Sequence, residues 1–150
     1  MLHFQWMPQQ GRGISPINIQ KMYWMKLSFS IIKGSYTIHR LSPASEIPGE
    51  IYQSSFYSIT RTNEELSVVC PSSLSVTSGD SNADWACFKV TGPLDFSLTG
   101  VLADISAVLA EEGISVFVMS TFDTDYILVK ADTLERAKEA LRNKKHTIVD

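Results

Sequence analysis

Residues 98–109 constrain the fold of this chain most, because their apolar side chains recur at the spacing of a helix. The steps along the segment are 3, 1, 3, 3 and 1, which line up one continuous apolar stripe. The residues of the stripe are Leu98, Val101, Leu102, Ile105, Val108 and Leu109. Asp95 or Ser97 is placed to cap the start of this helix, and Gly113 supplies a left-handed stop after it. We therefore expect an amphipathic helix that buries one face.

Strand-like segments surround this helix, and a second helix follows them. The expected strands are residues 85–90, 114–120, 126–129 and a short one at 147–149. The second helix carries the stripe Leu134, Ala137 and Leu141, after a capping box formed by Asp132 and Glu135. The order of elements from residue 81 onward is therefore βαββαβ, which is the split βαβ arrangement of ferredoxin-like folds.

The first half of the chain has strands but lacks a comparable helix. We expect a hairpin from strands at 26–32 and 36–41 that turns at Gly34 and Ser35, then a strand pair at 56–60 and 66–69. The segment between these strands, residues 42–53, is short and carries Pro43 and Pro48, so a full crossover helix fits poorly there. The domain organisation we expect is a flexible extension at 1–24, a degenerate and mostly β half at 25–80, and a complete βαββαβ half at 81–150.

Composition and charge narrow the class of protein. The 150 residues are 44% apolar and 19% charged, which is ordinary for a globular chain. Residues 1–80 carry six basic and five acidic side chains, for a charge of +1, and residues 81–150 carry seven and eleven, for −4. An acidic second half argues against a nucleic-acid surface, which needs clustered Lys and Arg. It suits a ligand with a cationic group.

The sequence also indicates where the protein is located and the state of its two cysteines. No apolar run reaches the roughly 18 residues that a membrane span needs, and residues 1–24 do not have the pattern of a signal peptide. We therefore expect a cytoplasmic protein that does not bind membranes. Cys70 and Cys87 each lie in a β-like apolar run, so buried thiols are expected, although the sequence leaves a disulfide open.

Signatures of enzymes and metal sites are absent from the sequence. There is no phosphate-binding glycine loop, no nucleophile elbow and no cysteine or histidine pair at metal-ligand spacing. The three histidines, His3, His39 and His146, lie far apart along the chain. We therefore expect no catalytic residue, no metal and no cofactor.

Two polar segments remain as the candidate ligand site. Residues 92–100 open the first helix, whose free N–H groups favour a carboxylate, and residues 120–126 join two strands. Gly100 fits close approach of a ligand and fits tight helix packing equally well. Asp125 directly precedes an apolar strand and can pair with an ammonium or guanidinium, whereas Asp123 is more typical of a turn. If the strand ending at Ser120 lies beside the strand before the helix, both segments meet at one edge.

The same residues resemble the ACT domain, a regulatory module of amino-acid metabolism. The resemblance covers residues 25–149 and rests on Gly100-Val101-Leu102-Ala103-Asp104-Ile105, on Gly113-Ile114-Ser115-Val116 and on the segment 120–129. The last segment resembles the branch that contains aspartate kinase regulatory domains and the CASTOR-type cytosolic arginine sensor of animals. Residues 27–41 and 56–71 resemble the N-terminal partner half of small ACT proteins.

The resemblance implies an α+β fold of two ferredoxin-like ACT halves, the first degenerate and mostly β. It implies a non-catalytic sensor that binds an amino acid, forms a homodimer and regulates a protein partner. The ligand-binding residues that it implies are Gly100, Val101, Leu102, Thr121, Phe122 and Asp125, with Ser58 and Ile59 lent by the partner half. The alternative is a structural or oligomerisation module whose ligand pocket is vestigial.

Overall fold

The structure, a computed structural model, describes residues 26–91 and 100–149. Its strands are β1 (Ser28–Leu41), β2 (Ser58–Arg61), β3 (Leu66–Pro71), β4 (Asp80–Val90), β5 (Val116–Ser120), β6 (Asp125–Lys130) and β7 (Thr147–Val149). Its helices are α2 (Val101–Glu111), α3 (Leu134–Asn143) and the short 3₁₀ turns η1 (Gly49–Gln53) and η2 (Ala131–Thr133). The expected βαββαβ order is confirmed as β4-α2-β5-β6-α3-β7, and the α+β class with it.

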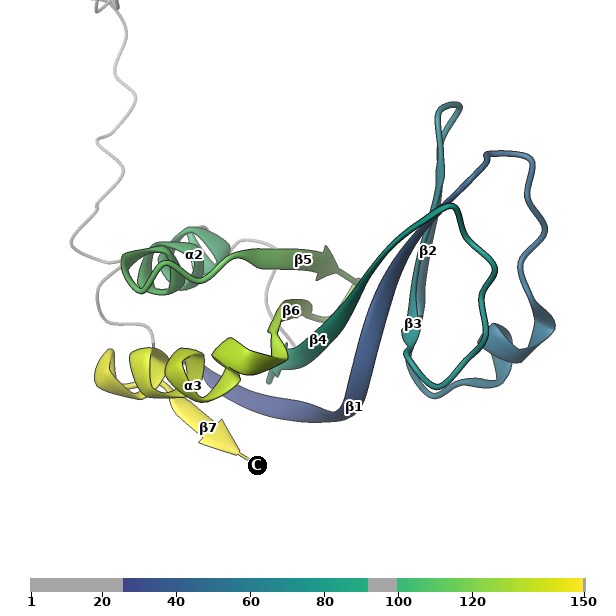
Figure 1. Cartoon of the computed structure of the whole chain (residues 1–150). Helices are drawn as coiled ribbons and strands as arrows, with labels where there is room; N and C mark the ends of the chain where they lie inside the picture. Colours follow the sequence, from purple (N-terminus) through teal and green to yellow (C-terminus); the bar gives the residue numbers. More distant parts are fainter. Residues whose placement is uncertain (1–25, 92–99, 150) are drawn as a thin grey trace, which may run out of the picture.

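The seven strands form one curled sheet (Figure 1). Its order is β2-β3-β1-β4-β6-β5, and β7 pairs in parallel with the beginning of β1. β1 and β4 are the two longest strands, and they lie next to each other in the middle of the sheet. β1 pairs with β4 from Phe29 to Arg40, and its last part also pairs with β3 on its other side. The degenerate half is therefore an extension of the same sheet.

The expected hairpin at Gly34 is wrong, because β1 continues through this position as a single bent strand. Its pairing with β4 shifts register between Ile32 and Tyr36, which marks a β-bulge. Gly34 has a φ of 112°, a conformation that side chains rarely adopt, and the Tyr36 hydroxyl donates to the Lys33 carbonyl at 3.1 Å. The glycine that we expected to reverse the chain bends it instead.

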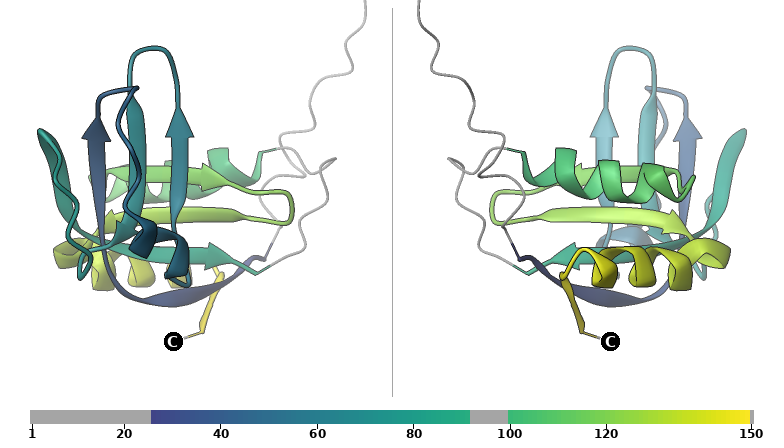
Figure 2. Two further views of the ribbon diagram at one scale, coloured as in Figure 1. Left: turned by 90° about the vertical axis from the view of Figure 1, so that its right-hand side faces the viewer. Right: turned by 90° about the vertical axis from the view of Figure 1, so that its left-hand side faces the viewer.

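Helices α2 and α3 lie side by side on one face of the β4-β6-β5 part of the sheet (Figure 2). The main core fills the space between them and the sheet, and it contains Phe29 and Phe88, which meet edge-to-face with 6.1 Å between ring centroids. The apolar stripe of the first helix accounts for this packing, since Val101, Ile105, Val108 and Leu109 are all buried. Such burial is what stabilises a short helix.

The opposite face of the sheet folds over a second core. The strands β1, β3 and β2 stand steeply across β5 and β6 in Figure 2, so the sheet wraps around its own concave side. Tyr36, Trp85 and Leu128 are buried in this second core, and Phe56 packs against it. A third cluster around Ile51 and Leu66 lies on the outer face of β2 and β3, under η1.

The expected cap of the second helix is wrong. Asp132 does not cap α3, whose N-cap is Thr133, and no side-chain capping bond forms there. Cys70 and Cys87 are buried free thiols, as expected. Burial raises the pKa of the Cys87 thiol to about 12. The extension at 1–24 and the expected caps Asp95 and Ser97 lie outside the described residues. Neither α2 nor α3 is long and apolar enough to cross a membrane.

Candidate functional site

The start of α2 is built on Gly100. This glycine is the N-cap, and its φ of 86° is left-handed, which explains why a residue without a Cβ stands there. Its carbonyl accepts the first helical bond, from the Asp104 N–H at 2.9 Å. The Val101 side chain is buried in the main core and that of Leu102 packs against it. What these two residues can offer a ligand is therefore their backbone N–H groups, which the first helical turn leaves unpaired.

The turn between β5 and β6 is held by two threonines. The Thr121 hydroxyl donates to the Thr124 carbonyl at 2.9 Å, so it is used within the turn. The Thr124 hydroxyl is buried and donates to the Val90 carbonyl at 2.5 Å, which fastens the turn to the end of β4. Thr124 was not among the residues expected from the sequence to form the site. A threonine that ends a polar turn just before a strand is the signal that could have found it.

Asp125 lies at the first position of β6, opposite Ser120 on β5. The Ser120 hydroxyl donates to its carboxylate at 2.5 Å. Asp125 shares a face with Ile127 and Val129, which pack in the core beneath the helices. Its carboxylate is therefore on the helix side of the sheet and only partly buried.

The helix start and the hairpin turn lie at the same end of the molecule (Figure 2). This end holds Gly100, Val101 and Leu102 at the helix start, with Thr121 and Asp125 at the hairpin. The strand next to β4 is β6, not the strand ending at Ser120 as expected, so β6 separates β5 from β4. Phe122, at the tip of the turn, is 80% exposed.

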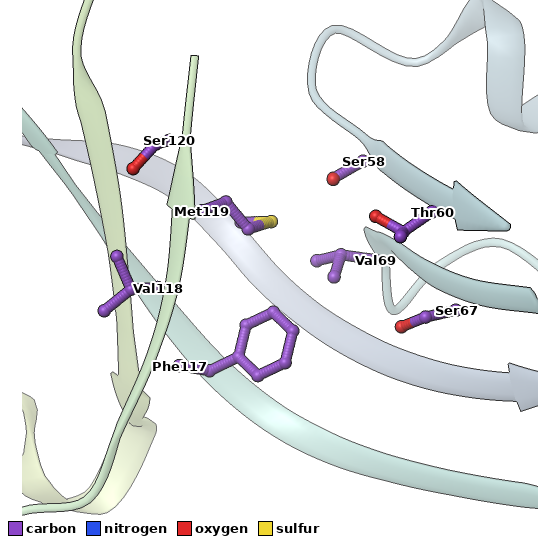
Figure 3. Close-up of a pocket in the computed structure, with 8 residues that line it drawn as sticks. All are labelled: Ser58, Thr60, Ser67, Val69, Phe117, Val118, Met119 and Ser120. Carbon is purple, nitrogen blue, oxygen red and sulfur yellow. The ribbon is translucent and has the colours of Figure 1, made fainter. Parts of the chain in front are cut away.

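Ser58 and Ile59 lie on β2, and only Ser58 faces the hairpin, across a groove that Ser120 also lines. Ile59 packs against the third cluster on the outer face of β2. Ser58 points the other way and lines a groove of about 260 Å³ between β2, β3 and the edge of β5 (Figure 3). The groove was not expected from the sequence, because it exists only once the sheet curls. Its lining residues are Ser58, Thr60, Ser67, Val69, Phe117, Val118, Met119 and Ser120.

A buried histidine lies between the first turn of α2 and the start of β7. His146 is buried just before β7, and its Nδ1 accepts the backbone N–H of Leu27 at 3.2 Å. Its Nε2 lies 3.7 Å from Oδ2 of Asp104, in the first turn of α2. Burial lowers the pKa of His146, and the Asp104 carboxylate partly opposes that shift. Burial therefore favours the neutral form of the His146 imidazole, which lies next to the first turn of α2.

We find no cluster of metal-binding side chains in the part of the chain that the structure describes. Within residues 26–91 and 100–149, no three His, Cys, Asp or Glu side chains are grouped so that they could hold an ion. The candidate site therefore consists of backbone N–H groups, hydroxyls and one carboxylate.

Two family models match parts of the chain. A family model described as an ACT domain matches residues 80–143, and a model described as an N-terminal domain matches residues 34–74. The structure of protein Atu0741 from Agobacterium tumefaciens is 38% identical, with a TM-score of 0.77 over 83% of this chain and 93% of that one. No curated protein sequence matches the chain.

More distant structures share the fold. A Vibrio cholerae protein described as of unknown function and a possible transport protein, VC0802, is 19% identical, with a TM-score of 0.65 over 87% of this chain and 98% of that one. The regulatory subunit of aspartate kinase from Thermus thermophilus is 12% identical, with a TM-score of 0.54 over 77% and 95%. The ACT match covers β4 through α3, the part that carries the helix start and the hairpin. The chain contains an ACT domain at residues 80–143.

Proposed function

We propose that this protein is a non-catalytic regulator that binds a free amino acid at the helix-start and hairpin end of its C-terminal unit. The observation that carries the proposal is the position of Asp125 on the helix side of the sheet, at the same end as the start of α2. The likeness to the aspartate kinase regulatory subunit of Thermus thermophilus supports a regulatory role of this general kind. Residues 81–150 would form the binding unit, and residues 25–80 its partner half.

The proposed site matches the two charges of an amino acid. The backbone N–H groups at Gly100, Val101 and Leu102 would hold the α-carboxylate, because a helix start has free donors and a positive dipole end. The Asp125 carboxylate would pair with an ammonium or guanidinium group. Thr121 would contribute by shaping the turn, since its hydroxyl is already bonded within it. Phe122 would cover the ligand from the tip of the turn.

Assembly and location belong to the same proposal. We propose a homodimer, because β5 and β2 end the sheet path and strands with open edges tend to be covered in natural proteins. The regulated partner would be a separate protein. Two reduced, buried cysteines fit a cytoplasmic location. Light scattering at high protein concentration tests the dimer, and a mass of one chain would contradict it.

One observation favours a second function, a structural module whose pocket is vestigial. Val101 and Leu102 pack with the core, and the Thr121 hydroxyl is used inside the turn, so these side chains serve the fold itself. A thermal-shift screen against the twenty amino acids separates the two functions. A ligand present at 100 times its dissociation constant raises the free energy of unfolding by about 2.7 kcal/mol. If one or a few amino acids raise the melting temperature, the sensor function is supported. If no amino acid raises it, the structural module is supported.

A further inference from the structure

The segment between β3 and β4, residues 72–79, is fastened to the outer face of β1 near both of its ends by side-chain hydrogen bonds. At its start, the Ser72 hydroxyl bonds the Thr37 hydroxyl at 2.8 Å. Near its end, the Ser78 hydroxyl bonds Nδ1 of His39 at 2.9 Å. Thr37 and His39 are two positions apart on β1, so their side chains point to the same face. We call residues 72–79 the strap.

Between these two bonds the strap is held by apolar contacts. Leu74 and Val76 are half-buried and pack against the third cluster, which contains the fully buried thiol of Cys70. The strap contains no helix or strand, and most of its other residues are exposed. Segments with few buried contacts open locally at a lower free-energy cost than global unfolding. The strap is therefore a cover that can separate while the sheet beneath it stays folded.

Of the two fastenings, only the one at His39 includes an ionisable side chain. His39 is 6% exposed, and its Nε2 has no hydrogen-bond partner among the residues that the structure describes. Burial lowers the pKa of His39 from its ordinary 6.5, and burial is the cause of that shift. The space under the strap therefore favours the neutral form of the ring.

The groups around His39 offer a charged ring no counterion. The residues opposite it are Val68 on β3 and Ser81 on β4, and the strap carries no ionisable side chain. On the same face of β3 lies Cys70, whose thiol pKa is raised by burial. Glu65 pairs with Arg40. The other charged side chains of the surrounding segments are exposed, namely Glu46, Glu50, Arg61, Glu64 and Asp80.

A proton on His39 would therefore bury a charge that lacks a partner. The protonated ring has two N–H donors, and Nδ1 can still donate to the Ser78 hydroxyl. Nε2 would carry the other donor, and it has no acceptor among the described residues. Such a charge is strongly unfavourable away from water. Separation of the strap hydrates the ring, at the expense of the contacts of Leu74 and Val76.

We propose that the strap is a proton-controlled cover: protonation of His39 separates residues 72–79 from the outer face of β1 and β3 and uncovers the third cluster with the Cys70 thiol. The pKa of His39 is lower in the closed form than in the open one, so the open form takes up the proton first as the pH falls. The strap is fully closed above pH 6.5 and opens below it. This device does not depend on the amino-acid site proposed above.

The test measures how fast dithiodipyridine modifies each cysteine of the full chain at about pH 7.5 and about pH 5.5. Each rate is divided by the rate for glutathione at the same pH, which removes the effect of pH on thiol reactivity itself. The relative rate at Cys70 should rise about three- to tenfold at the lower pH. Cys87, buried in the second core, reports global opening and should stay at least about tenfold slower than Cys70. An unchanged rate at Cys70, or equal rates at the two cysteines, would overturn the proposal.

Three variants assign the response to His39. His39→Gln takes up no proton and keeps a hydrogen-bonding side chain, so it should remove the rise at Cys70. Thr37→Val is the matched control, because it removes the bond to Ser72 and should speed labelling at both pH values while the rise remains. His146→Asn should also leave the rise in place. A rise that persists in His39→Gln, or that disappears in either of the other two variants, would contradict the assignment.

A measurement on the unaltered chain keeps the proposal testable should His39→Gln fail to fold. The imidazole resonances of His39, followed by nuclear magnetic resonance against pH, should give a pKa below 6.5. A pKa of 6.5 or higher would overturn the proposal, because protonation would then not favour separation of the strap.

Discussion

The imidazole of His146 bonds the residue before β1 through Nδ1, and its Nε2, which has no hydrogen-bond partner among the described residues, lies 3.7 Å from the Asp104 carboxylate of α2. Nδ1 accepts the Leu27 N–H, so the ring proton must sit on Nε2, where it faces the carboxylate. The next backbone bond, from the Thr147 N–H to the Leu27 carbonyl at 2.9 Å, starts the pairing of β7 with β1. A proton added to Nδ1 would remove the hydrogen bond from the Leu27 N–H, because Nδ1 could no longer accept it.

Stability is therefore expected to fall in mild acid. Burial lowers the pKa of His146 in the folded state from its ordinary 6.5, so the unfolded chain takes up protons first as the pH falls. The contribution is fully present above pH 6.5 and is lost as the pH falls through the lowered folded pKa. Burial also lowers the pKa of His39, which acts in the same direction. Melting temperatures measured from about pH 7.5 to about pH 5.5 should show the decline.

His146→Asn is the matched variant, because its side-chain carbonyl can still accept the Leu27 N–H while it takes up no proton. The variant should lose part of the pH dependence and keep the part due to His39. A decline between these pH values that is identical in wild type and variant would show that His146 is not its source.

Gly113, which follows α2, should not tolerate a side chain without a loss of stability. Its φ is 67°, and its N–H donates to the Ala110 carbonyl while the Ile114 N–H donates to that of Leu109, both at 2.9 Å. Gly113→Ala should lower the free energy of unfolding by about 1 kcal/mol through backbone strain alone, since a Cβ there meets nothing within 4 Å. Gly49→Ala is the control, with equal space and no left-handed backbone. Urea denaturation that gives both variants the same stability would refute the strain.

The bend in β1 should depend on the Tyr36 hydroxyl. Tyr36→Phe keeps the buried ring and removes the bond to the Lys33 carbonyl, so it should destabilise the fold by about 1 kcal/mol. Tyr57→Phe, in which the ring is 39% exposed, should change stability by less than about 0.5 kcal/mol. Chemical denaturation of the two variants compares them directly, and equal losses would contradict the role of the bond.

Thr124 should fix the hairpin turn relative to β4. Thr124→Val removes the donor to the Val90 carbonyl at a site where the threonine is only 5% exposed, and should cost about 1–3 kcal/mol. Thr124→Ser keeps the hydroxyl and should recover most of that loss. Thermal melts would settle the matter, with equal stability of the valine and serine variants counting against the bond.

The C-terminal half could be predicted from the sequence because its signals are local. The stripe from Val101 to Leu109 and the stop at Gly113 reflect the period and the left-handed backbone of one helix, and both are present in the structure. The bend at Gly34 could not be predicted in the same way. A glycine with positive φ serves a hairpin and a β-bulge equally, and only the pairing of β1 with β4 on both sides of it decides between them.

The candidate site shows the same division. Asp125 could be singled out from its place at the start of an apolar run. The role of Thr124 and the groove near Ser58 depend on contacts between residues far apart in the chain, which no local pattern encodes. Ser58 and Ile59 look equivalent in sequence, yet neighbouring residues of a strand point to opposite faces. Because the sheet curls, Ser58 lines the groove and Ile59 packs against the third cluster.

The central claim, that Asp125 binds the cationic group of an amino acid, is tested most directly by calorimetry with the amino acid found in the thermal-shift screen. Asp125→Asn keeps an acceptor for the Ser120 hydroxyl and removes the charge, so the fold should remain while affinity falls about ten- to a hundredfold. Asp123→Asn, in the exposed turn, should bind within about twofold of wild type. Equal affinity of wild type and Asp125→Asn would contradict the account.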